Sequence, residues 1–252
     1  MTVLLFFLLG AALAIGCDRL ILRFQRVYEA DDELENAGDA PVSAIEAVEA
    51  ALEGSETAPE PRLDVKQLPW QVEPWSSRLR RGVVLFLPLL TAVAGWRFDR
   101  AIDAIAVSLL VAGLLVCTAT DLLRYRVPNA VTYPGTLLAL LAAFLLAPSS
   151  TELLNAFLAA LFAGLIFLVM AVITRGGLGL GDVKLSVLIG AALGLQAAYQ
   201  ALALGVLAGG IIMGLLWALH FIGRKQAIPY APFLALAAVL VLLVQGPVFA
   251  PL

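Results

Sequence analysis

The sequence predicts an all-α fold, a polytopic transmembrane bundle of about eight helices. Of its 252 residues, 62% are hydrophobic and only 14% are charged. A soluble domain of this size is about half apolar and about a quarter charged. The apolar residues are gathered in long runs, and about 20 such residues cross roughly 30 Å of hydrocarbon. A soluble fold is therefore excluded.

The N-terminal part divides into two predicted regions. An apolar run ends in several arginines, which predicts a first transmembrane helix over residues 1–24. Residues 25–82 are predicted to be an acidic, partly disordered cytosolic segment, because 12 of the 19 Asp and Glu residues lie between Glu29 and Asp64. Such a composition favours a solvated segment. An acidic surface that attracts a basic peptide is the alternative.

Residues 83–252 are predicted to form a seven-helix membrane domain. Two glycine pairs with a spacing of four, Gly205/Gly209 and Gly210/Gly214, suit close packing between helices. The apolar runs of this domain are 83–96, 101–120, 131–147, 153–174, 183–196, 197–222 and 231–246.

The basic residues predict how the bundle is oriented. If the acidic segment lies in the cytoplasm and the helices alternate, 14 of the 16 Lys and Arg residues lie inside, and only Arg97 and Arg100 lie outside. Cytoplasmic loops carry an excess of Lys and Arg. We therefore expect a multi-pass protein of the inner (plasma) membrane, with Asp121 and Asp182 both at its cytosolic face.

Those two aspartates are the candidate catalytic residues. Carboxylates at membrane depth are costly and usually functional. Asp121 ends one apolar run, and Asp182 follows alternating glycines in a Gly-Leu-Gly-Leu-Gly-Asp-Val-Lys-Leu stretch. Each also has an ordinary explanation: Asp182 as a helix N-cap, and Asp121 as an ion-pair partner of Arg124 or Arg126.

Together the two aspartates suggest an intramembrane aspartyl protease. Two adjacent carboxylates share one proton, so that one activates water while the other polarises the scissile carbonyl. Neither a metal nor another cofactor is needed. Gly179 and Gly181 would let an extended peptide approach closely.

The segment after Asp121 carries further candidate residues. Pro128 favours an extended or turned backbone before it, and Asn129 is placed to cap the next helix. Lys184 marks the inner face or neutralises local charge. These three residues and the two glycines are the predicted substrate-binding set.

The sequence resembles the type IV prepilin peptidases, bacterial leader peptidases of the GxGD aspartyl protease class. The residues from Gly179 to Leu185 match the second aspartate motif of that family, and Asp121 with the Arg-Val-Pro-Asn ending at Asn129 matches the first. The Ile-Pro-Tyr-Ala-Pro-Phe stretch ending at Phe233 resembles the late motif of the family. The match covers most of 83–246.

The resemblance implies a substrate, a reaction and a catalytic pair. The substrate would be a prepilin or pseudopilin with a short basic leader before a hydrophobic helix, cut at the cytosolic membrane boundary by Asp121 and Asp182. Partners would be this precursor and the lipid bilayer, and no nucleic acid.

One departure from the family pattern concerns cofactors. The paired CxxC motifs, thought to bind zinc in many members, are absent from the acidic segment. No metal site is expected, and S-adenosylmethionine is expected only if methylation of the new N-terminus is retained.

Two other functions were weighed against this one. A presenilin-like or signal-peptide-peptidase-like protease shares the GxGD pattern but cuts within a transmembrane span. A proton-coupled transporter or a non-catalytic scaffold would also use intramembrane carboxylates.

Overall fold

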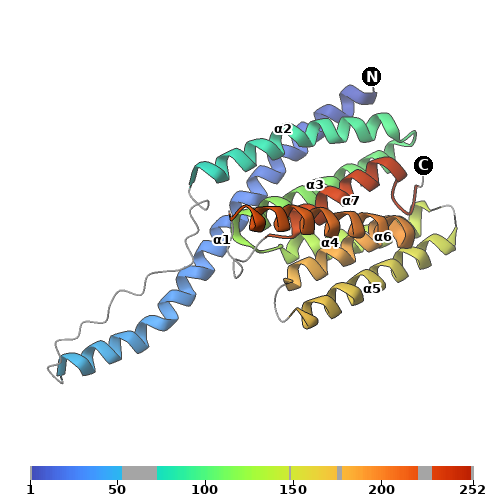
Figure 1. The fold of residues 1–252 in the computed structure, drawn as a ribbon. Helices are drawn as coiled ribbons and strands as arrows, with labels where there is room; N and C mark the ends of the chain where they lie inside the picture. The colour runs from blue at the N-terminus through green and yellow to red at the C-terminus, as the bar shows by residue number, and fades with distance from the viewer. Residues whose placement is uncertain (1, 53–72, 148, 175–177, 221–228, 251–252) are drawn as a thin grey trace.

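The computed structural model describes residues 2–52, 73–147, 149–174, 178–220 and 229–250, and for residues 29–52 and 73–79 it describes the backbone alone. Seven helices make up this described part, with no strand among them (Figure 1). They are α1 (Thr2–Leu52), α2 (Glu73–Arg97), α3 (Ala101–Arg124), α4 (Asn129–Leu146), α5 (Ser150–Ile173), α6 (Leu180–Ala218) and α7 (Ala231–Gln245).

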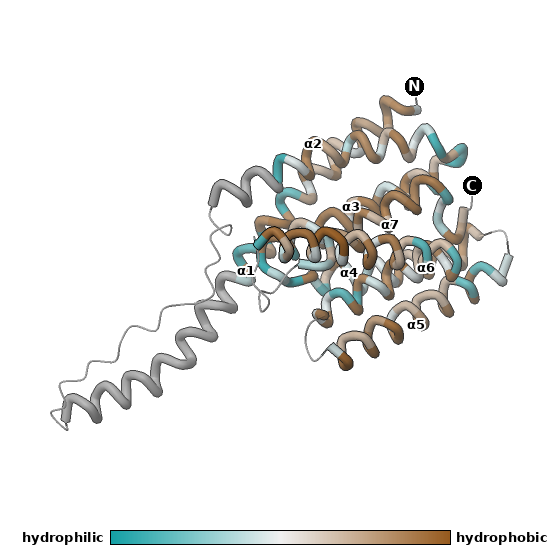
Figure 2. The backbone as a smooth tube through the Cα atoms, in the orientation of Figure 1, coloured by the Kyte–Doolittle hydropathy of each residue, from teal (hydrophilic) through white to brown (hydrophobic). Residues whose placement is uncertain are grey.

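The prediction of a polytopic helical bundle is confirmed. Within the described residues, five helices are long and apolar enough to cross a membrane, and α7 is a shorter apolar helix. Figure 2 shows hydrophobic stretches along most helices, with hydrophilic residues gathered at helix ends and connections. The chain is a multi-pass membrane protein.

The count of eight helices is not confirmed, and the difference lies in α6. This helix contains two predicted helices, 183–196 and 197–222. It is interrupted at Gly194, whose φ of 75° and ψ of 175° are not helical. A side chain is strained at such a φ, so glycine is the residue that suits this position.

The chain reverses direction at Gly194. A straight helix from Asp182 to Gly209 would span ~40 Å at 1.5 Å per residue. Yet Tyr230 lies against Gly209, and the charge of Asp182 acts on that same tyrosine. Asn155 of α5 supports the turn, because its side-chain oxygen accepts a hydrogen bond of 2.9 Å from the backbone N–H of Leu195.

Four alanines and Phe167 face inward on α5, and most of its other large side chains face outward. Its buried residues are Ala156, Ala159, Ala160, Ala163 and Phe167. Its exposed large residues include Leu161, Phe162, Leu165, Ile166 and Val169. Alanine lets helices approach closely, and large apolar side chains are compatible with lipid. The pattern therefore suits a helix packed on α6 with its other face toward a bilayer.

The two N-terminal helices are longer than their predicted apolar runs. α1 continues past the predicted span 1–24 into the acidic segment as far as Leu52, and α2 begins ten residues before position 83, at Glu73. Residues 53–72 lie outside the described residues. α1 packs on α2, and α2 packs on α3. The division into domains at 24 and 82 remains a prediction.

Candidate active site

Asp121 lies in the last turn of α3. Its side chain is buried, with 6% exposed. The helix ends at Tyr125, a left-handed residue with φ of 53° whose backbone N–H donates to the Asp121 carbonyl oxygen at 2.9 Å. A left-handed residue is a common helix end, but the conformation is uncommon for a bulky side chain. The sharp end turns the chain directly from Asp121 toward Pro128 and α4.

Asp182 lies in the first turn of α6 and is also buried, with 7% exposed. The N-cap of this helix is Gly179, so the alternative that Asp182 is an ordinary N-cap is wrong. Its backbone N–H donates to the Gly179 carbonyl oxygen at 3.1 Å, and its carboxylate receives the backbone N–H of Gly179. A free helix N-terminus favours a carboxylate at this place.

The structure brings the two aspartates together. The charge of Asp182 acts on the carboxyl group of Asp121, so the two side chains are close enough to repel each other when both are ionised. Asp121 Oδ2 accepts a hydrogen bond of 3.1 Å from the backbone N–H of Ala231, at the start of α7. The ends of α3, α6 and α7 therefore converge on one site.

Tyr230 borders this site from the α7 side. Its hydroxyl donates to the Val206 carbonyl oxygen at 2.8 Å, and its ring packs against Gly209. Burial, followed by the negative charge of Asp182, raises the pKa of Tyr230. The predicted packing role of Gly205/Gly209 is thus specific, because this pair faces α7 and Tyr230, whereas Gly210 and Gly214 have nothing within 4 Å of an added Cβ.

Gly181 joins the two aspartate motifs. A Cβ added to it would lie 3.0 Å from both Cβ and Cγ2 of Val127. Glycine here allows the loop after α3 to lie directly on the start of α6. Close approach was expected at this glycine, but toward a substrate, and the contact observed is with the protein itself. Gly179, two residues earlier, is exposed. Gly177 lies outside the described residues.

Asn129 and Lys184 lie beside each other, but not as predicted for Asn129. The N-cap of α4 is the buried Pro128 and no side chain caps this helix, so the prediction that Asn129 caps it is wrong. Instead the Asn129 Oδ1 atom accepts a hydrogen bond of 2.8 Å from the Lys184 Nζ atom. A proline cannot donate an N–H and has a fixed φ, which suits the position before the helix.

Two contacts of the structure, at Ala231 and Asp18, were not predicted. The Ala231 contribution is a backbone N–H, which no side-chain pattern reveals, although the late Pro-Tyr-Ala-Pro motif marked the right segment. Asp18 interrupts the first apolar run, and Arg80 of α2 binds it through two hydrogen bonds of 2.6 and 2.9 Å. An acid inside an apolar run was the available signal.

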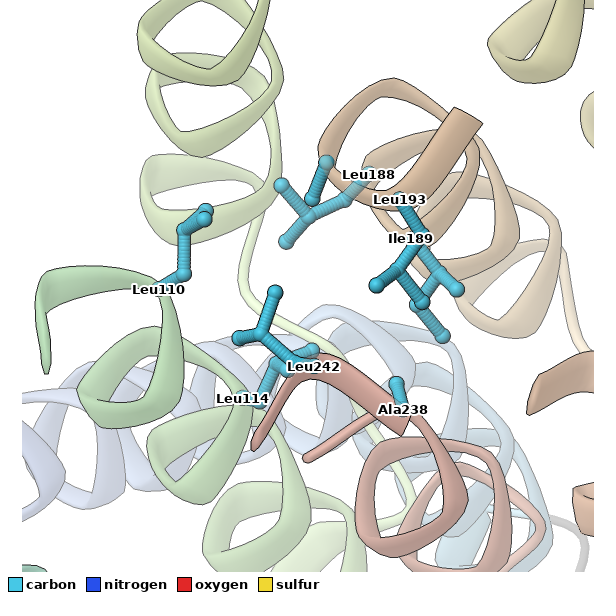
Figure 3. Close-up of a pocket in the computed structure, with 8 residues that line it drawn as sticks. Leu110, Leu114, Leu188, Ile189, Leu193, Ala238 and Leu242 are labelled. Atoms are coloured by element: carbon cyan, nitrogen blue, oxygen red, sulfur yellow. The ribbon is translucent and has the colours of Figure 1, made fainter. Parts of the chain in front are cut away.

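The interior behind the two aspartates is apolar and nearly solid. A cavity of about 10 Å³ lies between α3, α6 and α7, roughly two helical turns from the carboxylates. Figure 3 shows the leucines of three helices pointing into it. It is lined by Leu110, Leu114, Leu188, Ile189, Ala192, Leu193, Ala238 and Leu242. These side chains offer a water molecule no polar partner, so this layer packs beneath the two aspartates and does not bring water to them.

No group of three or more His, Cys, Asp or Glu side chains among the described residues could hold a metal ion. The two cysteines of the sequence, Cys17 and Cys117, are buried on different helices.

Comparison with known proteins gives a consistent answer. A family model described as the type IV leader peptidase family matches residues 108–219, which contain both aspartates and the Lys184–Asn129 contact. This segment makes up less than half of the chain, and over it the chain is similar to the type IV leader peptidase family. The predicted resemblance is confirmed.

Individual members of the family extend the match. A Bacillus subtilis (strain 168) protein named prepilin leader peptidase/N-methyltransferase is 30% identical over 155 residues, 60% of each chain. A Pseudomonas putida protein of the same name is 26% identical over 64% of this chain and 57% of its own length. One from Pseudomonas aeruginosa is 28% identical over 96% of this chain and 89% of its own length.

The matches differ in how much of each relative they cover. The chain spans only about six tenths of the length of the B. subtilis and P. putida relatives. No solved structure matches the chain. The similarity to leader peptidases therefore rests on sequence alone.

Proposed function

We propose that this protein is a membrane-embedded aspartyl endopeptidase that removes the basic leader from type IV prepilin-like precursors. The observation that carries the proposal is the pair of buried carboxylates, Asp121 and Asp182, held within mutual electrostatic reach where three helix ends converge. The pair lies inside the segment that matches the leader peptidase family. The relatives are named for prepilin leader processing, which supplies the proposed substrate class.

The proposed reaction is direct attack by water on the scissile carbonyl. One carboxylate, ionised, takes a proton from the water as its oxygen bonds to the carbonyl carbon. The other, protonated, donates its proton to the carbonyl oxygen, giving a neutral tetrahedral diol. Collapse of the diol breaks the C–N bond, a diol hydroxyl returns its proton to the second carboxylate, and the leaving nitrogen takes a proton from the first carboxyl group. The dyad returns to its starting state with one shared proton.

The surroundings of the dyad support these roles. Each carboxylate receives a backbone N–H, from Ala231 for Asp121 and from Gly179 for Asp182. Such donors orient a carboxylate and leave its charge largely uncompensated. An adjacent arginine would offset that charge. Gly179 is exposed and lies beside the Asp182 carboxylate, and we propose that an extended leader peptide passes along this edge toward Pro128.

The proposed site faces the cytosol, because the orientation inferred from the basic residues places it there. Prepilin leaders are basic, so they remain on that side while the hydrophobic segment enters the bilayer. Methyl transfer is not part of the proposal. The paired CxxC motifs that are thought to bind zinc in many members of the family do not occur in this sequence.

The test is cleavage of a purified precursor. The protein in detergent is mixed with a prepilin carrying an intact leader, beside Asp121→Asn and Asp182→Asn variants whose folding is verified by circular dichroism. The expected result is leader removal by the wild type, seen as a gel shift and confirmed by mass spectrometry, and none by either variant. Cleavage within the hydrophobic segment would indicate a presenilin-like protease. No cleavage of several prepilins by the folded wild type would favour a scaffold or transporter.

A further inference from the structure

We propose that Lys184 and Asn129 form a clasp that sets the spacing of Asp121 and Asp182. This would make them positioning residues for the proposed hydrolysis, and not the substrate contacts expected from the sequence. The inference rests on the proposed function for its catalytic meaning. The hydrogen bond between them, from Lys184 Nζ to Asn129 Oδ1 at 2.8 Å, joins two motifs that are 55 residues apart in the chain.

The geometry of α6 points the side chains of Asp182 and Lys184 in different directions. Lys184 follows Asp182 by two residues, so the two side chains leave the helix roughly 200° apart. Asp182 is turned toward the Asp121 side of the site, and Lys184 is turned toward α4. One helical turn can therefore present a carboxylate to the dyad while it fastens the neighbouring helix with an ammonium group.

One face of α4 is built to receive this ammonium group. Asn129 is the first residue of α4 and Tyr133 lies four residues later, which places them on the same face. The Lys184 Nζ atom lies 5.5 Å from the centre of the Tyr133 ring, within the range of a cation–π contact. A helix N-terminus disfavours a cation, so the amide oxygen and the ring face must offset that cost. This arrangement argues for a specific contact.

Tight backbone packing flanks the clasp on both sides. Val127 lies against Gly181, before the clasp, and an added Cβ at Gly135 would lie 3.2 Å from Leu188, beyond it. Val127 is joined to Asp121 through the left-handed turn at Tyr125. A loop released from Lys184 would move Val127 away from Gly181 and would carry the end of α3 with it. The separation of the two carboxylates therefore depends on the clasp.

The first test separates positioning from substrate contact by steady-state kinetics of leader removal. Lys184→Met and Asn129→Leu are each expected to lower kcat by about 10- to 100-fold with KM unchanged, because small displacements of catalytic groups have effects of that size. The double variant is expected to be no slower than either single one, since both remove the same contact. Asn129→Asp, which keeps an oxygen acceptor for Lys184, is expected to retain kcat.

A matched control lies at the opposite end of the bundle. Arg100 also bridges two helices with its cation, through Asp103 of α3 and the Leu146 carbonyl oxygen of α4. Arg100→Met should leave both kcat and KM unchanged. A rise in KM for Lys184→Met with kcat retained, or additive losses in the double variant, would overturn the clasp in favour of substrate contact.

The second test needs no activity, so it distinguishes failure of this inference from failure of the proposed function. Spin labels are placed at the exposed positions Leu180 and Ala130 as cysteines, in a variant whose two native cysteines are replaced. Double electron–electron resonance should give a narrow distance distribution with the clasp intact or with Asn129→Asp, and a broader one with Lys184→Met. An unchanged distribution in Lys184→Met would refute the clasp even if the wild type cleaved no prepilin.

Discussion

The two ends of the bundle treat their buried carboxylates in opposite ways. At the end where α3 begins, Asp103 is 5% exposed and is held by both Nε and a terminal nitrogen of Arg100, each at 2.8 Å. At the other end, Asp121 and Asp182 are equally buried, and in the described part of the chain neither forms an ion pair with Lys or Arg.

This difference is the one expected between a structural carboxylate and the proposed catalytic pair. A buried charge must be compensated, and an arginine does so while it also fixes the carboxylate in its ionised form. The backbone N–H groups of Ala231 and Gly179 compensate the charge of a buried carboxylate less completely than an arginine does. Each aspartate is therefore left able to exchange a proton. The end with incomplete compensation is therefore the one suited to acid–base chemistry.

The largest effect expected to sharpen this comparison comes from neutralising the carboxylates. Asp121→Asn and Asp182→Asn should each lower kcat for leader removal by about 10²–10⁴-fold, because a positioned acid or base is lost. Asp103→Asn, which keeps an oxygen acceptor for Arg100, should leave kcat unchanged. The measurement is initial rates on one prepilin at saturating concentration. A comparable loss in Asp103→Asn would remove the distinction between the ends.

A smaller effect is expected at the contact between the two aspartate motifs. Gly181→Ala adds a Cβ 3.0 Å from Val127, so the loop must shift by a few tenths of an ångström. We expect kcat to fall about tenfold, within the range known for misplaced catalytic groups. Gly210→Ala is the matched control, since an added Cβ there has nothing within 4 Å. Equal rates in the two variants would show that the contact is not needed for catalysis.

At the opposite end the expected effect is on stability. Arg100→Met leaves Asp103 buried without its cation, which should lower the free energy of unfolding by about 1–2 kcal/mol. This is less than the 3–5 kcal/mol of a fully buried pair, because 57% of the Arg100 side chain is exposed. Unfolding by titration with a denaturing detergent measures the change. A loss of kcat without a loss of stability would contradict the assignment of this end as structural.

The smallest effect is expected from Tyr230→Phe. This change removes the hydrogen bond to the Val206 carbonyl oxygen and keeps the ring against Gly209. We expect the free energy of unfolding to fall by about 1 kcal/mol, the usual net value of one hydrogen bond, and kcat to change little. The same detergent titration and rate assay apply. A loss of kcat as large as that of the aspartate variants would assign the Tyr230 hydroxyl a direct part in the reaction.

Particular residues show how much of the fold and of the candidate site could be predicted from the sequence. Local patterns were sufficient for the helical bundle, for the break near Gly194, and for the choice of Asp121 and Asp182. Apolar runs and isolated acids are properties of short stretches, and the cost of burying a charge in lipid applies whatever the neighbouring helices are. The distribution of basic residues predicts which end of the bundle faces the cytosol, and this orientation remains a prediction.

Local patterns were misleading where a residue is used by a distant one. Asparagine is a residue type that often caps helices, which is why Asn129 was predicted to cap α4. In the structure its side chain accepts a hydrogen bond from Lys184, and Pro128 occupies the N-cap position. Gly181 lies against Val127, a contact that the local pattern did not predict, and its expected role beside a substrate remains a prediction. A polar side chain at a helix end can bind a residue of another helix instead of capping its own, and only the packing shows which partner it has.

By itself, the sequence determined that this chain is a multi-pass helical protein with two exceptional acids at helix ends, because hydrophobicity and charge act residue by residue. Tertiary structure alone decided that Asn155 supports the turn at Gly194, that the Ala231 N–H reaches Asp121, and that Lys184 contacts α4. These are contacts between segments 40 to 110 residues apart. They depend on backbone direction and on close helix approach, which no local pattern encodes.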